Sequence, residues 1–170
     1  AFTLHAWDAV VELTGPEGKR LQPIHDFYLR AGKVDIRKGE LQTAILIPEE
    51  SYKNCFGHYI KYAMRNAMDI ATLGTSVNVR LSEDQKTVER CRIAFGVAGP
   101  VPTRAETAEQ SAAGKPLTAE LAETVARTVL EEIQPRDSWR AAKAFRQHIA
   151  VEIAKRCLVK SIELAGGELA

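Results

Sequence analysis

The stretch that decides the fold is residues 71–98, which read ATLGTSVNVRLSEDQKTVERCRIAFGVA. Apolar and polar side chains alternate through residues 71–81, and apolar side chains recur in a similar way through residues 87–98. Alternation with a period of two is typical of β-strands that bury one face. The polar turn at 82–86 is short, and a connection of this length joins antiparallel neighbours. The stretch therefore predicts a pair of antiparallel strands.

Further strands are predicted on the N-terminal side of this pair. Residues 57–64 read as one strand, and residues 40–47 form the clearest strand of the chain. Its positions on one face are Leu41, Thr43, Ile45 and Ile47. Closer to the N-terminus, a strand at 6–13, a glycine- and proline-containing turn at 14–18 and a strand at 19–24 predict a hairpin.

The periodicity becomes helical after residue 101. A first short helix is predicted from Pro102-Thr103-Arg104 to about Ala113, and residues 114–116 break it. Thr118 can cap a second helix, because its side-chain oxygen can accept a hydrogen bond from a backbone N–H of the first turn. The apolar stripe of that helix is Leu121, Val125 and Val129.

A third helix is predicted to be the longest. Asp137 or Ser138 caps it, and Gly166-Gly167 stops it. Phe145, Ile149 and Ile153 are spaced four apart and predict one stripe buried against the sheet. Trp139 fits either a core anchor or an interface anchor, and the core is favoured.

The order of strands first and helices last indicates the α+β class rather than alternating βαβ units. We expect the strands of residues 57–98 to form a three-stranded antiparallel sheet packed on the helices. A domain boundary is predicted near residues 48–54.

The composition of the 170 residues is that of an ordinary globular protein, with 45% apolar residues, 26% charged residues and a net charge of +1. This charge gives no field that would attract nucleic acid or a membrane, and no apolar run approaches a bilayer span. The three cysteines are Cys55, Cys91 and Cys157. Their odd number and wide spacing predict reduced thiols in a cytoplasmic protein, with no zinc or iron–sulfur ligands.

Motifs for hydrolysis or phosphate binding are absent, and the four histidines lack ligand spacing. No catalytic residue and no metal site is therefore predicted. One segment is locally unusual, because Lys61, Arg65 and Asp69 place two cations and an acid beside a strand. On charge alone, Lys61 and Asp69 are equally well explained as a surface ion pair.

Four motifs in order carry a family resemblance. Residues 58–74, HYIKYAMRNAMDIATLG, resemble the K-x-x-x-R-x-x-x-D-I-A signature of FAD-binding subunits in the molybdenum hydroxylase family, most of all those of bacterial xanthine dehydrogenases. Residues 39–48 resemble the E-I-L…I-P strand of that family. Residues 95–105 resemble its G-G-V-A…P-x-R-A segment, and residues 135–146 its P-x-S-x-R-A-S…Y-R helix start.

This resemblance implies a division of the chain. Residues 1–50 correspond to the end of a PCMH-type FAD-binding subdomain, and residues 55–170 to the molybdenum hydroxylase flavoprotein C-terminal domain. The family holds the FAD pyrophosphate on glycine-rich G-G-T and G-G-N turns, neither of which occurs here. Together with the apolar start at Ala1, this departure predicts a fragment or one chain of a split subunit, although loss of an initiator Met explains Ala1 equally well.

The resemblance also implies cofactor-binding residues. The lysine matching Lys61 reaches the polar edge of the isoalloxazine ring. Asp69 and Ile70 match a mobile loop near the flavin face, and Gln42 matches a residue that packs near the ring. Arg104, Arg140 and Arg146 are interpreted as docking or structural cations.

The function implied is electron transfer. In the family, electrons leave the substrate at a molybdenum cofactor on one subunit, cross two [2Fe–2S] clusters on another, and reach FAD, which reduces NAD. The partners would be the molybdenum-binding and iron–sulfur subunits, with no nucleic acid and no membrane. The alternative is a non-catalytic docking domain that binds no cofactor independently.

Overall fold

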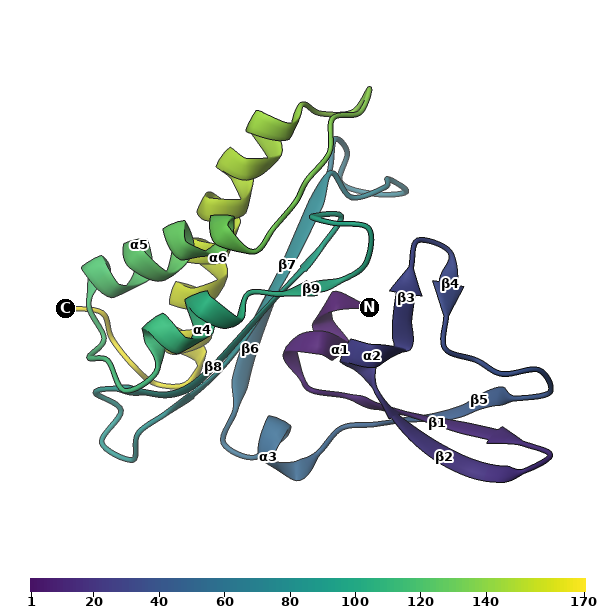
Figure 1. Ribbon diagram of the computed structural model, residues 1–170. Coiled ribbons are helices and arrows are strands. Elements are labelled where there is room, and N and C mark those ends of the chain that lie inside the picture. The colour runs from purple at the N-terminus through teal and green to yellow at the C-terminus, as the bar shows by residue number, and fades with distance from the viewer.

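A computed structural model describes residues 1–170 (Figure 1). Its larger sheet has four antiparallel strands in the order β6-β7-β8-β9. They are β6 (Phe56–Tyr62), β7 (Leu73–Leu81), β8 (Val88–Gly96) and β9 (Thr103–Arg104). Val77 pairs with Ile93 at the centre of the predicted strand pair, which confirms its antiparallel pairing.

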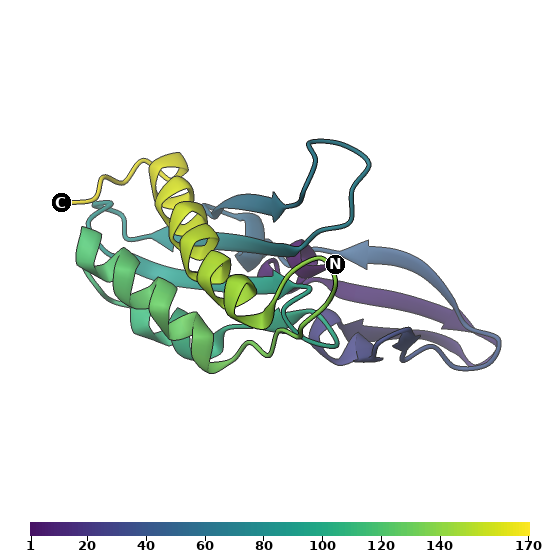
Figure 2. The same cartoon turned by 90° about the horizontal axis from the view of Figure 1, so that it is seen from above.

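Helices cover one face of this sheet (Figure 2). They are α4 (Glu106–Ala112), α5 (Ala119–Thr128), the 3₁₀ helix η1 (Val129–Glu131) and α6 (Lys143–Leu164). A core of 26 buried residues lies between the helices and the sheet, and Phe95, Leu158 and Ile162 are fully enclosed in it. Burial of one such side chain contributes about 1.5–3 kcal/mol. None of the helices is long and apolar enough to cross a membrane.

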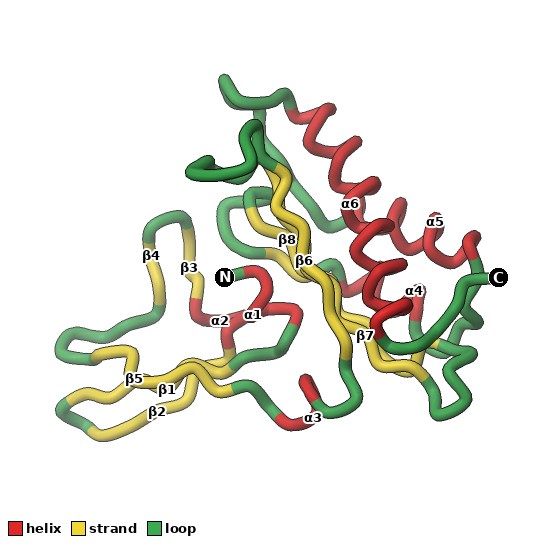
Figure 3. The backbone as a smooth tube through the Cα atoms, turned by 180° about the vertical axis from the view of Figure 1, so that it is seen from behind, coloured by secondary structure: helices red, strands yellow, loops and turns green.

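The opposite face of the sheet carries α1 (Phe2–Ala6), so residues far apart in sequence lie side by side (Figures 1 and 3). The Phe2 ring lies over Gly74 and Gly96, where a Cβ atom would come within 2.4 Å and 2.2 Å of ring carbons. Asn78 donates from its side chain to the carbonyl of Ala6 at 3.4 Å. The polar face of β7 is therefore buried under α1.

A second, smaller sheet has the order β2-β1-β5. Its strands are β1 (Val10–Gly15), β2 (Gly18–Pro23) and β5 (Leu41–Leu46). Short elements complete this part of the chain, namely α2 (Ile24–Phe27), β3 (Tyr28–Arg30), β4 (Lys33–Val34) and α3 (Glu49–Tyr52). The predicted hairpin and the strand at 40–47 are confirmed, but a register shift opposite Glu12 and Leu13 places Leu41 and Ile45 on opposite faces rather than on one. The side chain of Leu41 is nevertheless 72% exposed, and only five residues form the core of this part.

The structure corrects two of the predicted strand and helix boundaries in the first 104 residues. Ala6, the first residue of the strand predicted at 6–13, is instead the last residue of α1, and the strand begins at Val10. Thr103 and Arg104 do not open a helix but pair with Phe95 and Ala94 as β9, which makes the sheet four-stranded. The predicted α+β class is confirmed.

Residues 137–145 also differ from the prediction. The long helix begins at Lys143, although Asp137 still accepts a hydrogen bond of 2.7 Å from the backbone N–H of Lys143. Trp139 is 86% exposed and Phe145 is 43% exposed, so the predicted burial of both is wrong. Trp139 lies in the turn that the bridge between Ser138 and Ala141 closes, ahead of the helix rather than on its buried face. The predicted cap at Thr118 is confirmed by a 3.0 Å bond from the N–H of Leu121.

Candidate functional site

Three of the four predicted cofactor-binding residues lie together. Lys61 is on the edge strand β6, and Asp69 and Ile70 are in the loop of residues 63–72 that connects β6 to β7. The ammonium of Lys61 donates to the backbone carbonyl of Asp69 at 2.5 Å. Lys61 is exposed, and its ammonium has two further N–H donors that bond to no other residue of the chain.

The carboxylate of Asp69 shapes its own loop. It accepts hydrogen bonds from the backbone N–H groups of Arg65 at 2.9 Å and Ile70 at 2.8 Å. Desolvation raises the pKa of Asp69, but these N–H groups outweigh it and the pKa is lowered. The ion pair considered from the sequence is not formed, because Lys61 contacts the carbonyl of Asp69 while Arg65 lies 3.7 Å from its carboxylate.

Gln42 lies elsewhere. It is exposed on β5, where it pairs with Leu13 of β1 in the smaller sheet. The structure therefore brings Lys61, Asp69 and Ile70 together and places Gln42 on a different sheet.

A charged junction between α1 and the larger sheet was not found from the sequence. Asp8, with φ of 46°, accepts a hydrogen bond of 2.6 Å from Arg104 and one of 3.1 Å from Arg92. It also contacts Arg90 and lies 3.0 Å from Nε2 of His25. Desolvation raises the pKa of Asp8, but the hydrogen bond with His25 and the charges of the arginines lower it overall.

Glu109 on α4 is the second acid of this junction. Its carboxylate accepts 2.5 Å bonds from Nε and Nη2 of Arg104 and a 2.8 Å bond from the backbone N–H of Ile93. Arg104 is accordingly a structural cation held between two acids. The signal in the sequence was the alternation of Arg90 and Arg92 along a predicted strand, which places both on one face.

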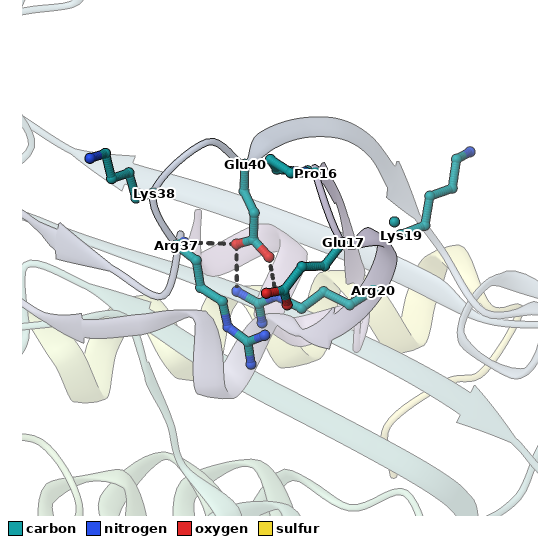
Figure 4. A pocket seen from close by; sticks show the side chains of 9 residues that line it. Pro16, Glu17, Lys19, Arg20, Arg37, Lys38 and Glu40 are labelled. Atoms are coloured by element: carbon teal, nitrogen blue, oxygen red, sulfur yellow. Dashed lines mark hydrogen bonds and ion pairs between the residues drawn. The ribbon is translucent and has the colours of Figure 1, made fainter.

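The hairpin of β1 and β2 carries a pocket lined by Arg20 and Glu40, which pair with each other (Figure 4). Glu40 accepts two bonds from Arg20, at 2.7 Å and 2.9 Å, and one of 2.7 Å from the backbone N–H of Arg37. The hydrogen bonds from Arg20 lower the pKa of Glu40 to about 2. A carboxylate that is so fully bonded belongs to the architecture of the hairpin.

No group of three or more His, Cys, Asp or Glu side chains is arranged to hold a metal ion. The three cysteines are free and buried. Desolvation raises the pKa of the Cys157 thiol to about 12 and also raises the pKa of Cys55 and Cys91, so all three are protonated near neutral pH.

Residues 58–161 match the family described as the CO dehydrogenase flavoprotein C-terminal domain. The chain belongs to this family. The matched range begins in β6, three residues before Lys61, and ends within α6. It contains the larger sheet and its covering helices, and the predicted family membership is confirmed.

Relatives of the family domain extend the match to most of the chain. The xanthine dehydrogenase FAD-binding subunit of Escherichia coli O157:H7 is 38% identical over 163 residues, which are 96% of this chain and 55% of that subunit. The glyceraldehyde dehydrogenase medium chain of Sulfolobus acidocaldarius is 28% identical over 86% of this chain and 50% of its own length. The chain thus spans about half the length of these relatives.

A solved structure has the same fold as this chain. Carbon monoxide dehydrogenase from Hydrogenophaga pseudoflava superposes with a TM-score of 0.85 at 27% identity, over 95% of this chain and 54% of the matched chain. The likeness therefore covers the smaller sheet as well as the family domain.

Proposed function

We propose that the chain is the C-terminal part of the FAD-bearing electron-transfer subunit of a xanthine dehydrogenase-like molybdenum hydroxylase. In this proposal its partners are a molybdenum-binding subunit and an iron–sulfur subunit with [2Fe–2S] clusters, and NAD accepts the electrons. The family membership and the names of the relatives support an oxidoreductase complex of this type. The buried, protonated thiols agree with a cytoplasmic location.

The observation that carries the proposal is the geometry of Lys61. Its ammonium is fixed by the carbonyl of Asp69 and still has N–H donors free at an exposed sheet edge. A bound FAD would supply two-electron chemistry, with negative charge gathering at the N1 and O2 edge of its ring on reduction. A positioned cation stabilises that charge more than it stabilises the neutral oxidised ring. The position of Lys61 therefore fits contact with the ring edge.

The other residues have supporting roles in this proposal. Asp69 holds the loop of residues 63–72 in shape through the N–H groups of Arg65 and Ile70, which leaves the side chain of Ile70 exposed toward a ring face. We assign Gln42 to ring packing on the assumption that residues 1–50 belong to the FAD-binding subdomain and residues 55–170 form the C-terminal domain.

The chain offers little for the rest of the cofactor. Pyrophosphate sites need consecutive backbone N–H groups in a glycine-rich nest. The left-handed glycines of this chain stand singly in separate turns. We therefore expect residues 1–170 to contact only the ring and to bind FAD weakly when isolated.

A docking domain without independent cofactor binding is the second candidate. The exposed side chains of Leu21 and Leu41, which lie on the same face of the smaller sheet, favour it, because exposed apolar side chains of this kind are covered in an assembled protein.

One reconstitution separates the two candidates. The 170-residue chain is mixed with the N-terminal half of the Escherichia coli O157:H7 relative, and FAD binding is followed by visible absorbance and flavin fluorescence quenching. The flavin proposal expects binding in the mixture but not by either piece alone, and weaker binding with Lys61→Met than with the control Lys53→Met. Binding that is equal for both variants would leave docking as the supported function.

A further inference from the structure

Two loops meet at the same end of the molecule (Figures 1 and 2). One is the loop of residues 63–72, and the other is the segment of residues 134–142 that leads into α6. Phe145 and Tyr62 join them through an edge-on ring contact with centroids 6.0 Å apart. We call these two loops together with Phe145 the loop surface.

A buried arginine without a carboxylate partner lies beneath the loop surface. Arg146 is 3% exposed and takes part in no salt bridge. It donates to the carbonyl of Thr72 in one loop and, at 2.8 Å, to the hydroxyl of Ser138 in the other. Its Nε has no partner, and neither has the hydroxyl of Thr72. Buried charges are ordinarily paired, because an unpaired one is costly.

The charge around Arg146 is unbalanced. The pKa of Arg146 is lowered mainly by desolvation and further by repulsion from Arg136 and Arg140. Asp137 is the acid of the segment, and its carboxylate already accepts the N–H of Lys143. Four cations thus face one acid between positions 136 and 146, namely Arg136, Arg140, Lys143 and Arg146. An external anion would relieve this repulsion.

Large apolar side chains are exposed beside these cations. Trp139 carries the guanidinium of Arg140 over its ring at 4.2 Å. Met64 and Met68 are exposed on the neighbouring loop, with Met68 reaching 96%. Aromatic, methionine and arginine side chains are enriched where proteins bind proteins, and a stacked Trp–Arg pair is a typical anchor.

We propose that the loop surface docks an acidic segment of the electron-donating partner subunit, with Trp139 as its apolar anchor and Arg136 and Arg140 binding a partner carboxylate. This inference rests on the proposed function, which requires an electron donor close to the ring edge at Lys61. The surface satisfies that requirement because Lys61 donates to the carbonyl of Asp69, which lies in the loop of residues 63–72. A protein is favoured over nucleic acid, since the net charge of the chain is only +1 and Met64, Met68 and Trp139 are exposed beside the cations.

The test uses the complete complex, with this chain in its full-length subunit. Assembly with the purified iron–sulfur subunit is measured by titration in low and physiological salt for wild type, Trp139→Ala, Arg140→Glu and Arg140→Lys. Arg156→Glu is the matched control, because Arg156 is an exposed cation further along α6 that pairs with Glu152. Circular dichroism and flavin content show that each variant is folded and loaded. None of the substituted positions is assigned to the flavin.

We expect Arg140→Glu and Trp139→Ala to weaken assembly by about tenfold or more and Arg140→Lys to weaken it less, because lysine keeps the charge but loses the stack on Trp139, while Arg156→Glu stays near wild type. In Arg140→Lys, a carbodiimide should join position 140 to a partner carboxylate, which peptide mass spectrometry locates. Unchanged assembly for Arg140→Glu and Trp139→Ala would overturn the inference. So would oligonucleotide binding that Arg140→Glu abolishes while assembly is unaffected. A wild-type subunit that binds no iron–sulfur subunit at all would instead contradict the proposed function.

Discussion

Asp8, two residues after α1, accepts a 2.6 Å hydrogen bond from Arg104 on β9, 96 positions further along the chain. The contact fastens the start of the chain to the edge of the larger sheet. Because Arg104 is also bound to Glu109, the junction links α1, β9 and α4 in one network. The N-terminal segment is therefore held on the larger sheet by charge as well as by the packing of Phe2 over Gly74 and Gly96.

Asp8→Asn should destabilise the fold, because it removes the charge that offsets three guanidinium groups. Loss of one partner in a buried ion pair costs about 3–5 kcal/mol, and partial solvent screening at Asp8 reduces the expected loss to about 2 kcal/mol. Urea denaturation measures it, with exposed Asp26→Asn as control. Equal midpoints for the two variants would show that the junction adds no stability.

His5 predicts a pH dependence in a defined window. Desolvation lowers its pKa from 6.5 to about 4, so the unfolded chain binds the proton more readily than the folded one. The stability that neutral His5 contributes is therefore fully present above pH 6.5 and is lost as the pH falls from 6.5 to about 4. We expect about 2 kcal/mol less stability at the acid end of this window. His5→Gln should flatten the dependence, whereas exposed His148→Gln should leave it unchanged.

The close approach of Phe2 to Gly74 predicts a compensating pair of substitutions. Gly74→Ala places a methyl group in the Phe2 ring and should cost about 1–3 kcal/mol. In the Phe2→Ala background the same change should cost much less, since the ring has gone. A double-mutant cycle on unfolding free energies gives the coupling. Additive effects would show that α1 does not lie on the sheet as described.

Most of the larger domain could be predicted from local sequence patterns, whereas the remaining features depend on contacts between distant segments. Alternation predicted β7 and β8, and helical spacing predicted Leu121 and Val125 on the buried face of α5. Burial of the polar Asn78 was not predictable, because it depends on α1 covering that face.

The candidate site could likewise be predicted only in part from the sequence. The Lys61–Asp69 spacing was visible in the sequence, but the bond to a carbonyl rather than to the carboxylate depends on the conformation of the loop. Gln42 could not be placed relative to Lys61, since no local pattern relates two separate sheets.

Because Phe145 is exposed, its substitution should cost less stability than that of a buried residue of α6. Phe145→Ala should cost under about 1 kcal/mol, because most of its loss is one ring contact with Tyr62. Ile153→Ala removes a buried side chain from the main core and should cost about 2–5 kcal/mol. Thermal unfolding of both variants checks the order. A larger loss for Phe145→Ala would restore the stripe expected from the sequence.

Lys61→Met is the decisive substitution for the proposed function. It keeps the length of the side chain and removes the ammonium that Asp69 positions. Because the cation stabilises reduced flavin more than oxidised flavin, its loss should lower the flavin midpoint potential and slow NAD reduction by the complete complex. A partly exposed charge interaction is worth about 1 kcal/mol, which for a two-electron couple is a shift of roughly 20 mV.

Substrate oxidation with an artificial acceptor that takes electrons before the flavin should be unaffected. Lys53→Met controls for the loss of a surface charge, since Lys53 pairs only with Glu49 on α3. A wild-type potential and a wild-type rate of NAD reduction in Lys61→Met would make Lys61 a structural brace of the loop of residues 63–72, and the ring edge would then require another cation.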